Sequence, residues 1–156
     1  MERMRTKQLA AMSTKQLAVE EQRTWVLVCD SGDEVIAGLA EFANAERLSA
    51  ASIQGIGALS DVTLGYFDWA AKDYERVRLA EQVEVLSLLG DVALADGNPQ
   101  VHAHIVVGKR DGTAHGGHLM EGHVRPTLEL VVTETPVHLR KRIDPISGLA
   151  LIDPDR

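Results

Sequence analysis

At 156 residues, with 45% hydrophobic and 25% charged residues, the chain has the size and composition of one ordinary domain with a single core. Its net charge of −7 disfavours nonspecific nucleic-acid binding, because that affinity comes from Lys and Arg neutralising phosphates. Its single cysteine excludes an internal disulfide and a multi-cysteine zinc site, and no apolar run approaches the roughly 20 residues that span a bilayer.

Residues 1–22 are predicted to form an N-terminal extension to a single domain over residues 23–156. The pentapeptide TKQLA occurs twice in this extension, eight residues apart, and two copies do not make a solenoid. Both an amphipathic helix, with Leu9 and Leu17 near one face, and a loosely ordered segment fit the pattern. The extension has no apolar segment followed by a small-residue cleavage site, so we expect a cytoplasmic protein.

A strand and then a helix are the first predicted elements of the domain. The segment TWVLVC, residues 24–29, is rich in β-branched and aromatic residues and is typical of a strand, with Cys29 as a buried structural thiol. Ser31 and Glu34 then form the S-x-x-E pattern of a capping box. Apolar residues follow at helical spacing, namely Val35, Leu39 and Phe42. The sequence therefore predicts a helix over Gly32–Ala45 with one buried face.

The remaining segments indicate a succession of strands. Residues 48–68 alternate small and apolar residues around three glycines and predict a strand, a tight bend and a second strand. The GIG within them is no dinucleotide-binding motif, because Ser60 occupies its third position and β-rich sequence follows. Residues 83–98 predict a long or bulged strand, and VHAHIVVG, HLMEGHV and TLELVVTE predict further strands. One early helix followed by many strands predicts an α+β fold with a mainly antiparallel sheet.

The chain after Leu139 is predicted to be peripheral. It carries the basic cluster Arg140–Arg142, for which the pattern favours a solvated face over a phosphate site.

Five of the six histidines lie between Val101 and Val124. His102 and His104, two apart on a predicted strand, leave the same face with Cα atoms about 6.5 to 7 Å apart. A hairpin turning near Asp111-Gly112 would bring His118 back beside them, with Gly116-Gly117 available for a close approach. Three imidazoles suit zinc, or nickel or copper, and leave a position open for water or substrate. The alternative is that these histidines are merely polar residues on the wet face of a strand.

The other candidate residues are predicted to lie outside this site. His115 and His123 are expected to be exposed or to neighbour a ligand, and His138, beyond Pro136, is expected to be unrelated. Glu129 lies in an apolar strand, where it either orients a ligating imidazole, acts as a general base, or faces solvent, the last being favoured. No catalytic triad or phosphate-binding loop is present in the sequence, so no motif indicates a particular reaction or a catalytic residue.

The chain resembles the PPC domain, the plants and prokaryotes conserved domain, in four segments that follow in order: ASIQGIGALSDVTLGYFD, EVLSLLGDVAL, VHAHIVVG and GGHLMEGHVRPTLELVV. The resemblance covers about Arg23 to Glu134. It implies an α+β fold with a central, mainly antiparallel sheet and a few flanking helices, assembled as a homotrimer. It also implies that His102, His104 and His118 match the histidine motif of prokaryotic members, which look like metal binders.

Plant members carry an AT-hook, the short R-G-R-P segment that enters the minor groove, and stand-alone prokaryotic members are described as DNA-binding by analogy. This chain has no R-G-R-P, and its net negative charge is the opposite of the basic surface expected of a DNA-binding protein. The first hypothesis is therefore a homotrimer that binds a divalent metal, zinc by preference, and a small-molecule ligand, with metal-activated water as the chemistry if it is an enzyme. The alternative is a DNA-associated or regulatory interaction module without an AT-hook, or a metal that only stabilises the trimer.

Overall fold

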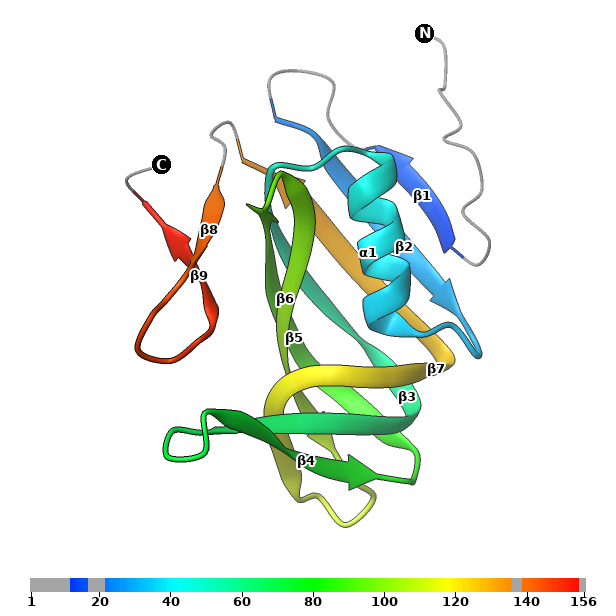
Figure 1. Cartoon of the computed structure of the whole chain (residues 1–156). Coiled ribbons are helices and arrows are strands. Elements are labelled where there is room, and N and C mark those ends of the chain that lie inside the picture. Colours follow the sequence, from blue (N-terminus) through cyan, green and yellow to red (C-terminus); the bar gives the residue numbers. More distant parts are fainter. Residues whose placement is uncertain (1–11, 17–21, 136–138, 155–156) are drawn as a thin grey trace, which may run out of the picture.

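The computed structural model describes residues 12–16, 22–135 and 139–154, which contain one helix and nine strands (Figure 1). The helix is α1 (Val35–Ala45), and the strands are β1 (Met12–Gln16), β2 (Thr24–Asp30), β3 (Ala50–Asp68), β4 (Asp73–Leu79), β5 (Val83–Ala95), β6 (Asn98–Gly108), β7 (Ala114–Glu134), β8 (Arg140–Ile143) and β9 (Ala150–Asp153). Every described strand pairing is antiparallel except a single β5–β8 bridge. The predicted mainly antiparallel sheet is thus confirmed, with one helix in the described chain where a few were expected. That helix is too short to cross a membrane.

Part of the N-terminal extension is a strand. Residues 12–16 form β1, which pairs antiparallel with β2 from Met12 opposite Cys29 to Gln16 opposite Trp25. The helix that the sequence allowed in the extension is therefore absent from this stretch. Leu9 and Leu17, on which that helix was based, lie outside the described residues, as does His138.

The helix α1 begins later than its capping pattern predicted. Glu34 is itself the N-cap, and its carboxylate accepts hydrogen bonds from the backbone N–H groups of Ile36 and Ala37 at 3.2 and 2.6 Å. The same carboxylate accepts from Gly122 N of β7 at 3.0 Å. Ser31, the predicted cap, instead donates to the carbonyl oxygen of Pro126. The prediction failed because Gly32 and Asp33, the first residues of the supposed helix, exchange backbone hydrogen bonds with Val124 of β7 in place of helical ones.

Four long strands close into a ring. Strand β3 pairs with both β5 and β7, and β6 pairs with the same two strands. Residues 50–68 form one continuous strand instead of the predicted strand, bend and strand, because register shifts near Gly57 absorb the bend. Strand β7 pairs with β6 near its start and then crosses to β3 and β2 (Figure 1). His118 lies where β7 leaves β6 for β3, because it pairs with His104 of β6 and with Gly65 of β3.

The inner face of these strands forms the core with α1. Alternate residues of β2 and β7 point inward, among them Leu27 and Leu130, and α1 buries Leu39 and Phe42 against them. Trp25 meets Phe42 edge to face, with ring centroids 5.5 Å apart. Cys29 is 1% exposed in this core, as the sequence predicted, and burial together with nearby acidic residues raises the pKa of its thiol to about 12.

The outer face of the same strands carries a different row of side chains. Neighbours across the strands follow one another in a single row: Val26 (β2), Val131 (β7), Gln54 (β3), Leu89 (β5), His104 (β6) and His118 (β7). Large apolar residues on this face stay exposed, including Ile56 at 61% and Leu89 at 60%. The candidate histidines thus stand at one end of a partly apolar, uncovered sheet face.

Candidate metal centre

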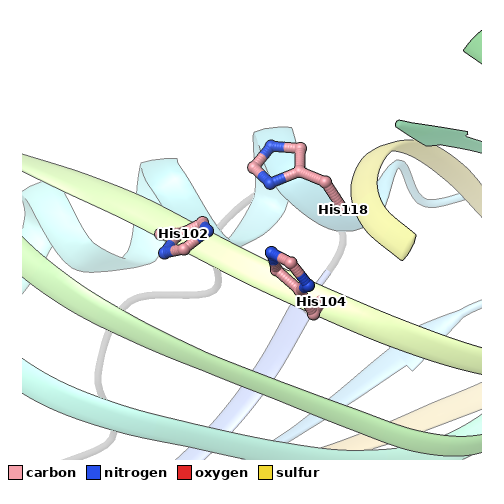
Figure 2. Close-up of side chains that lie close together, drawn as sticks. All are labelled: His102, His104 and His118. Carbon is pink, nitrogen blue, oxygen red and sulfur yellow. The ribbon is translucent and has the colours of Figure 1, made fainter. Parts of the chain in front are cut away.

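His102, His104 and His118 converge on the outer face, at the hairpin between β6 and β7 (Figure 2). His104 and His118 are direct cross-strand partners, and His102 lies two residues along β6 on the same face. Their ring centroids are 5.1 to 5.4 Å apart, and one candidate ligand nitrogen from each lies within 4.8 Å of the others. The hairpin geometry expected from the sequence is therefore the one observed.

The turn between β6 and β7 sets the register that brings these rings together. Lys109 N donates to Thr113 O at 2.9 Å, and the Asp111 carboxylate accepts from both N and Oγ1 of Thr113 at 2.9 and 2.6 Å. Gly112 takes a φ of +83°, a backbone conformation that residues with a side chain rarely adopt. The register fixed by this turn places His118 opposite His104.

Strand β7 also has to pass close to β3 just before His118. A Cβ at Gly117 would lie 2.8 Å from the carbonyl oxygen of Gly65, which is closer than any side chain tolerates. Gly117 thus permits the close approach that the Gly116-Gly117 pair suggested. As a result, His118 reaches the outer face beside Tyr74 of β4, with their ring centroids 4.9 Å apart.

Asp91 stands beside the cluster, although the sequence did not single it out. It is the cross-strand partner of His102 on β5, and its Oδ2 lies 3.3 Å from His102 Nδ1. Burial opposes ionisation of Asp91, but contacts with His102 and the charge of Lys141 outweigh burial, so its pKa lies below the usual value. A carboxylate beside one nitrogen of a ligating histidine fixes the ring and its tautomer. Asp91, and not Glu129, is therefore the carboxylate that stands beside a ring of the cluster.

Lys141 is the second residue of the site that sequence reasoning missed. The cluster Arg140–Arg142 was predicted to face solvent, and Arg140 and Arg142 are exposed. The side chain of Lys141 is 4% exposed, with Nζ 3.7 Å from Asp91 Oδ1. Alternation along β8 explains the correction, because β8 lies beside β5 and the side chain of Lys141 points toward Asp91, away from the side of its two exposed neighbours.

The electrostatics of the cluster favour the neutral imidazole at His104 and His118. Burial, together with the charges of His102, His104 and Lys141, lowers the pKa of His118 to about 4. Burial and the charge of His102 also lower the pKa of His104, against an opposing effect of Asp91. Neutral imidazole is the form that ligates a metal ion.

Two buried side-chain polar atoms in the described chain have no hydrogen-bond partner, and both lie in this site: His118 Nδ1 and Asp91 Oδ1. Buried polar atoms are normally satisfied, so two orphans in one place call for a group supplied from outside the subunit. Three imidazoles, one of which has an orphan ring nitrogen, fit a transition metal ion, because such ions take imidazole nitrogen as a ligand. The residues of the cluster thus could hold a metal.

The remaining candidate residues lie outside the cluster. His123 Nδ1 is 3.1 Å from Asp61 Oδ1, and His115 Nε2 is 3.2 Å from Thr113 Oγ1. Glu129 is exposed between Val28 and Ile56 on the outer face, which is the solvent-facing alternative that the sequence favoured. These three residues therefore make their contacts away from the three rings.

Comparison with known families yields one match over most of the chain. A profile of the Plants and Prokaryotes Conserved (PCC) domain, also abbreviated PPC, matches residues 16–136. Among curated proteins, the bifunctional protein GlmU of Synechococcus sp. (strain JA-3-3Ab) is 30% identical over 142 residues. That alignment covers 89% of this chain, but the chain spans only 22% of the length of that relative.

Solved structures match nearly the whole chain. The PPC protein of Pyrococcus horikoshii is 32% identical with a TM-score of 0.79, covering 94% of this chain and 97% of that one. A metal-containing protein of Archaeoglobus fulgidus is 30% identical with a TM-score of 0.77, covering 92% and 99%. A candidate DNA-binding protein of Bacteroides thetaiotaomicron is 26% identical with a TM-score of 0.84, also covering 92% and 99%.

Proposed function

Because the chain belongs to the Plants and Prokaryotes Conserved (PCC) domain family, we propose that it is a metal-binding member, in which His102, His104 and His118 hold a divalent ion, zinc by preference. The observation that carries the proposal is the convergence of three ring nitrogens within 4.8 Å, with His118 Nδ1 buried and without a partner. Similarity to a metal-containing protein of Archaeoglobus fulgidus supports it. Zinc is preferred because it commonly takes three histidines and leaves a fourth position open.

The protein's own residues prepare the site for such an ion. Asp91 lies next to His102 Nδ1, which favours a proton on that nitrogen and leaves Nε2 of the same ring as the ligand. Tyr74 covers one side of the His118 ring and limits its rotation. When bound, zinc held by three protein ligands supplies a Lewis acid with an open position for water or a small molecule.

Metal content is the direct test. Protein prepared without a metal-affinity tag and analysed by elemental mass spectrometry is expected to hold about one zinc per subunit. Dialysis against a chelator should remove the zinc, and added zinc should restore it in preference to nickel or magnesium. Protein that arrives metal-free and takes up no added zinc would refute the proposal.

The proposal includes a homotrimer whose subunits meet through the uncovered outer face. Apolar residues from three strands are exposed there, namely Ile56, Leu86, Leu89 and Val106. Ile56, Leu86 and Leu89 border a hollow of about 460 Å³ that Val26 and Val131 also line. A contiguous exposed apolar surface of this kind favours burial against another protein, and the family resemblance points to further copies of this chain.

Light scattering after size-exclusion chromatography tests the assembly. The wild-type protein is expected at three times the 17.0 kDa subunit mass, and Leu89→Asp should shift it to the monomer by placing a charge in the apolar contact. The matched control is Tyr66→Asp, an equally exposed residue near the end of β3. A wild-type monomer, or a trimer that survives Leu89→Asp, would contradict this part of the proposal.

DNA association is the second candidate function, supported by similarity to a candidate DNA-binding protein of Bacteroides thetaiotaomicron. The net charge of −7 weighs against it, since phosphate contacts need a basic surface. A gel-shift series at increasing salt separates the two functions. Binding that is steeply salt-dependent and persists near physiological salt would favour the DNA module, and its absence would leave metal binding as the better account.

A further inference from the structure

A pocket of about 480 Å³ opens directly beside the three histidines, and the proposed metal site leaves it without a role. His102 and His118 form part of its wall, and Tyr74 of β4 lies on the same wall. The C-terminal hairpin β8–β9 closes another side with apolar residues, namely Leu149, Leu151 and Ile152. A ligand in this pocket would therefore contact both the histidine site and an apolar surface.

The charged groups that line the pocket are one carboxylate and one ammonium. Asp91 and Lys141 face each other with Oδ1 and Nζ 3.7 Å apart, which is longer than a hydrogen bond. The side chain of Lys141 is 4% exposed, and Asp91 Oδ1 is buried without a hydrogen-bond partner. The buried ammonium group of Lys141 has three hydrogen-bond donors, and no charged partner in the described chain lies closer to it than 3.7 Å. It therefore retains the capacity to bind another acceptor.

The balance of charge in the pocket depends on the metal. Without an ion, the charges of Asp91 and Lys141 cancel. With a divalent ion on the histidines, the site becomes net positive next to an ammonium. An anion should therefore bind only when the metal is present. A single ammonium group beside a carboxylate matches the charge of a singly charged oxyanion better than that of a dianion. The apolar residues of the hairpin wall suit a ligand that also carries a hydrocarbon group.

Resting on the proposed metal site, we propose that this pocket binds a small organic carboxylate. Its anionic group lies between the bound ion and Lys141, and its apolar body lies against the β8–β9 hairpin. Lys141 then orients the ligand, and the hairpin selects for an apolar group beyond the carboxylate. The C-terminal hairpin is in this view a wall of the binding site and not a peripheral tail.

Cobalt-loaded protein tests this directly, because the visible absorption of Co²⁺ responds to a new ligand. Isovalerate, a small branched carboxylate, is titrated into wild-type protein and Lys141→Met. The comparison ligands are inorganic phosphate and isovaleramide, which has the same hydrocarbon group as isovalerate but no charge. We expect saturable isovalerate binding that is about tenfold weaker in Lys141→Met, since one charge-assisted contact is lost. Isovaleramide and phosphate should bind more weakly than isovalerate.

Two further variants keep the test informative. Arg140→Met removes a positive charge from an exposed neighbour on β8 that lines a different pocket, and it should bind isovalerate like the wild type. Ile152→Asp retains Lys141 but places a negative charge on the partly exposed hairpin wall, and it should weaken isovalerate binding even if Lys141→Met fails to fold.

The outcomes separate this inference from the metal proposal. Failure of Co²⁺ to bind the wild type would refute the metal site itself. Co²⁺ binding with no response to isovalerate, an equal response to isovaleramide, tighter binding of phosphate, or unchanged affinity in both Lys141→Met and Ile152→Asp would overturn the carboxylate pocket alone.

Discussion

The inner and outer faces of the same strands differ in how completely their side chains are packed and hydrogen-bonded by the rest of the chain. Along β7, Leu128 and Leu130 point inward and are fully buried against the protein's own core. Between them, Glu129 points outward and is exposed. On the outer face the large apolar side chains stay in solvent, and two buried polar atoms lack partners. The inner face is thus covered by the chain itself, whereas the outer face leaves apolar side chains and polar atoms of the described chain uncovered.

This difference indicates which residues serve stability and which serve function. A strand has a period of two, so each long strand contributes to both faces at once. Inward residues are held by close packing, which tolerates little change in volume. Outward residues carry groups that a metal, a ligand or another subunit can satisfy. Substitutions on the two faces should therefore fail in different assays.

The largest expected effect is on the outer face. His104→Ala removes one of the three proposed ligands, and metal content should fall from about one to about zero per chain while the fold is retained. His115→Ala is the matched control, because it removes an imidazole of the same hairpin that contacts Thr113. Elemental analysis and circular dichroism of both variants check this. If His104→Ala retained its full metal content, the outer face would not hold the metal through this histidine.

On the inner face, Leu130→Ala should reduce the free energy of unfolding by about 3 kcal/mol, because it leaves a cavity in a close-packed core. The same change at Leu151, half-exposed on β9, should cost about 0.5 kcal/mol or less. Denaturant unfolding of metal-free protein measures both. Equal losses at the two positions would show that the core is not where the packing assigns it.

Asp91→Asn should weaken the proposed zinc binding by about tenfold, since a carboxylate beside the proposed ligand His102 orients the ring and raises its basicity. Glu129→Gln is the control, because it neutralises a carboxylate of the same face that is exposed and away from the rings. Competition with a chromophoric chelator measures the affinities. If both variants bind zinc alike, Asp91 does not act on the site.

The smallest expected signal comes from Cys29. Its thiol is 1% exposed with a pKa of about 12, so the reactive thiolate is scarce at pH 8 and is shielded from reagent. Ellman's reagent should react with the native protein far more slowly than with protein unfolded in guanidinium. Rapid complete labelling of the native protein would place this thiol at the surface instead.

Periodicity in the sequence was sufficient to predict much of this structure. The β-branched and aromatic composition of residues 24–29 predicted a strand, and the helical spacing of Val35, Leu39 and Phe42 predicted a helix, because both signals are local in the sequence. The spacing of His102 and His104, with a turn at Asp111-Gly112, predicted which imidazoles meet, because a tight hairpin fixes its own register. Resemblance to the family indicated the same α+β fold with a central, mainly antiparallel sheet.

Contacts between distant segments decided the rest. The helix starts after Glu34 because β7 binds the preceding backbone, which no local pattern encodes. Asp91 and Lys141 join the histidines from β5 and β8, and their sequence neighbours give no sign of it, since a charged residue on a strand is usually solvated. Sequence by itself thus determined the elements and the histidine hairpin, and tertiary packing decided which charged side chains stand beside it, because burial of a charge depends on segments that meet only in the folded chain.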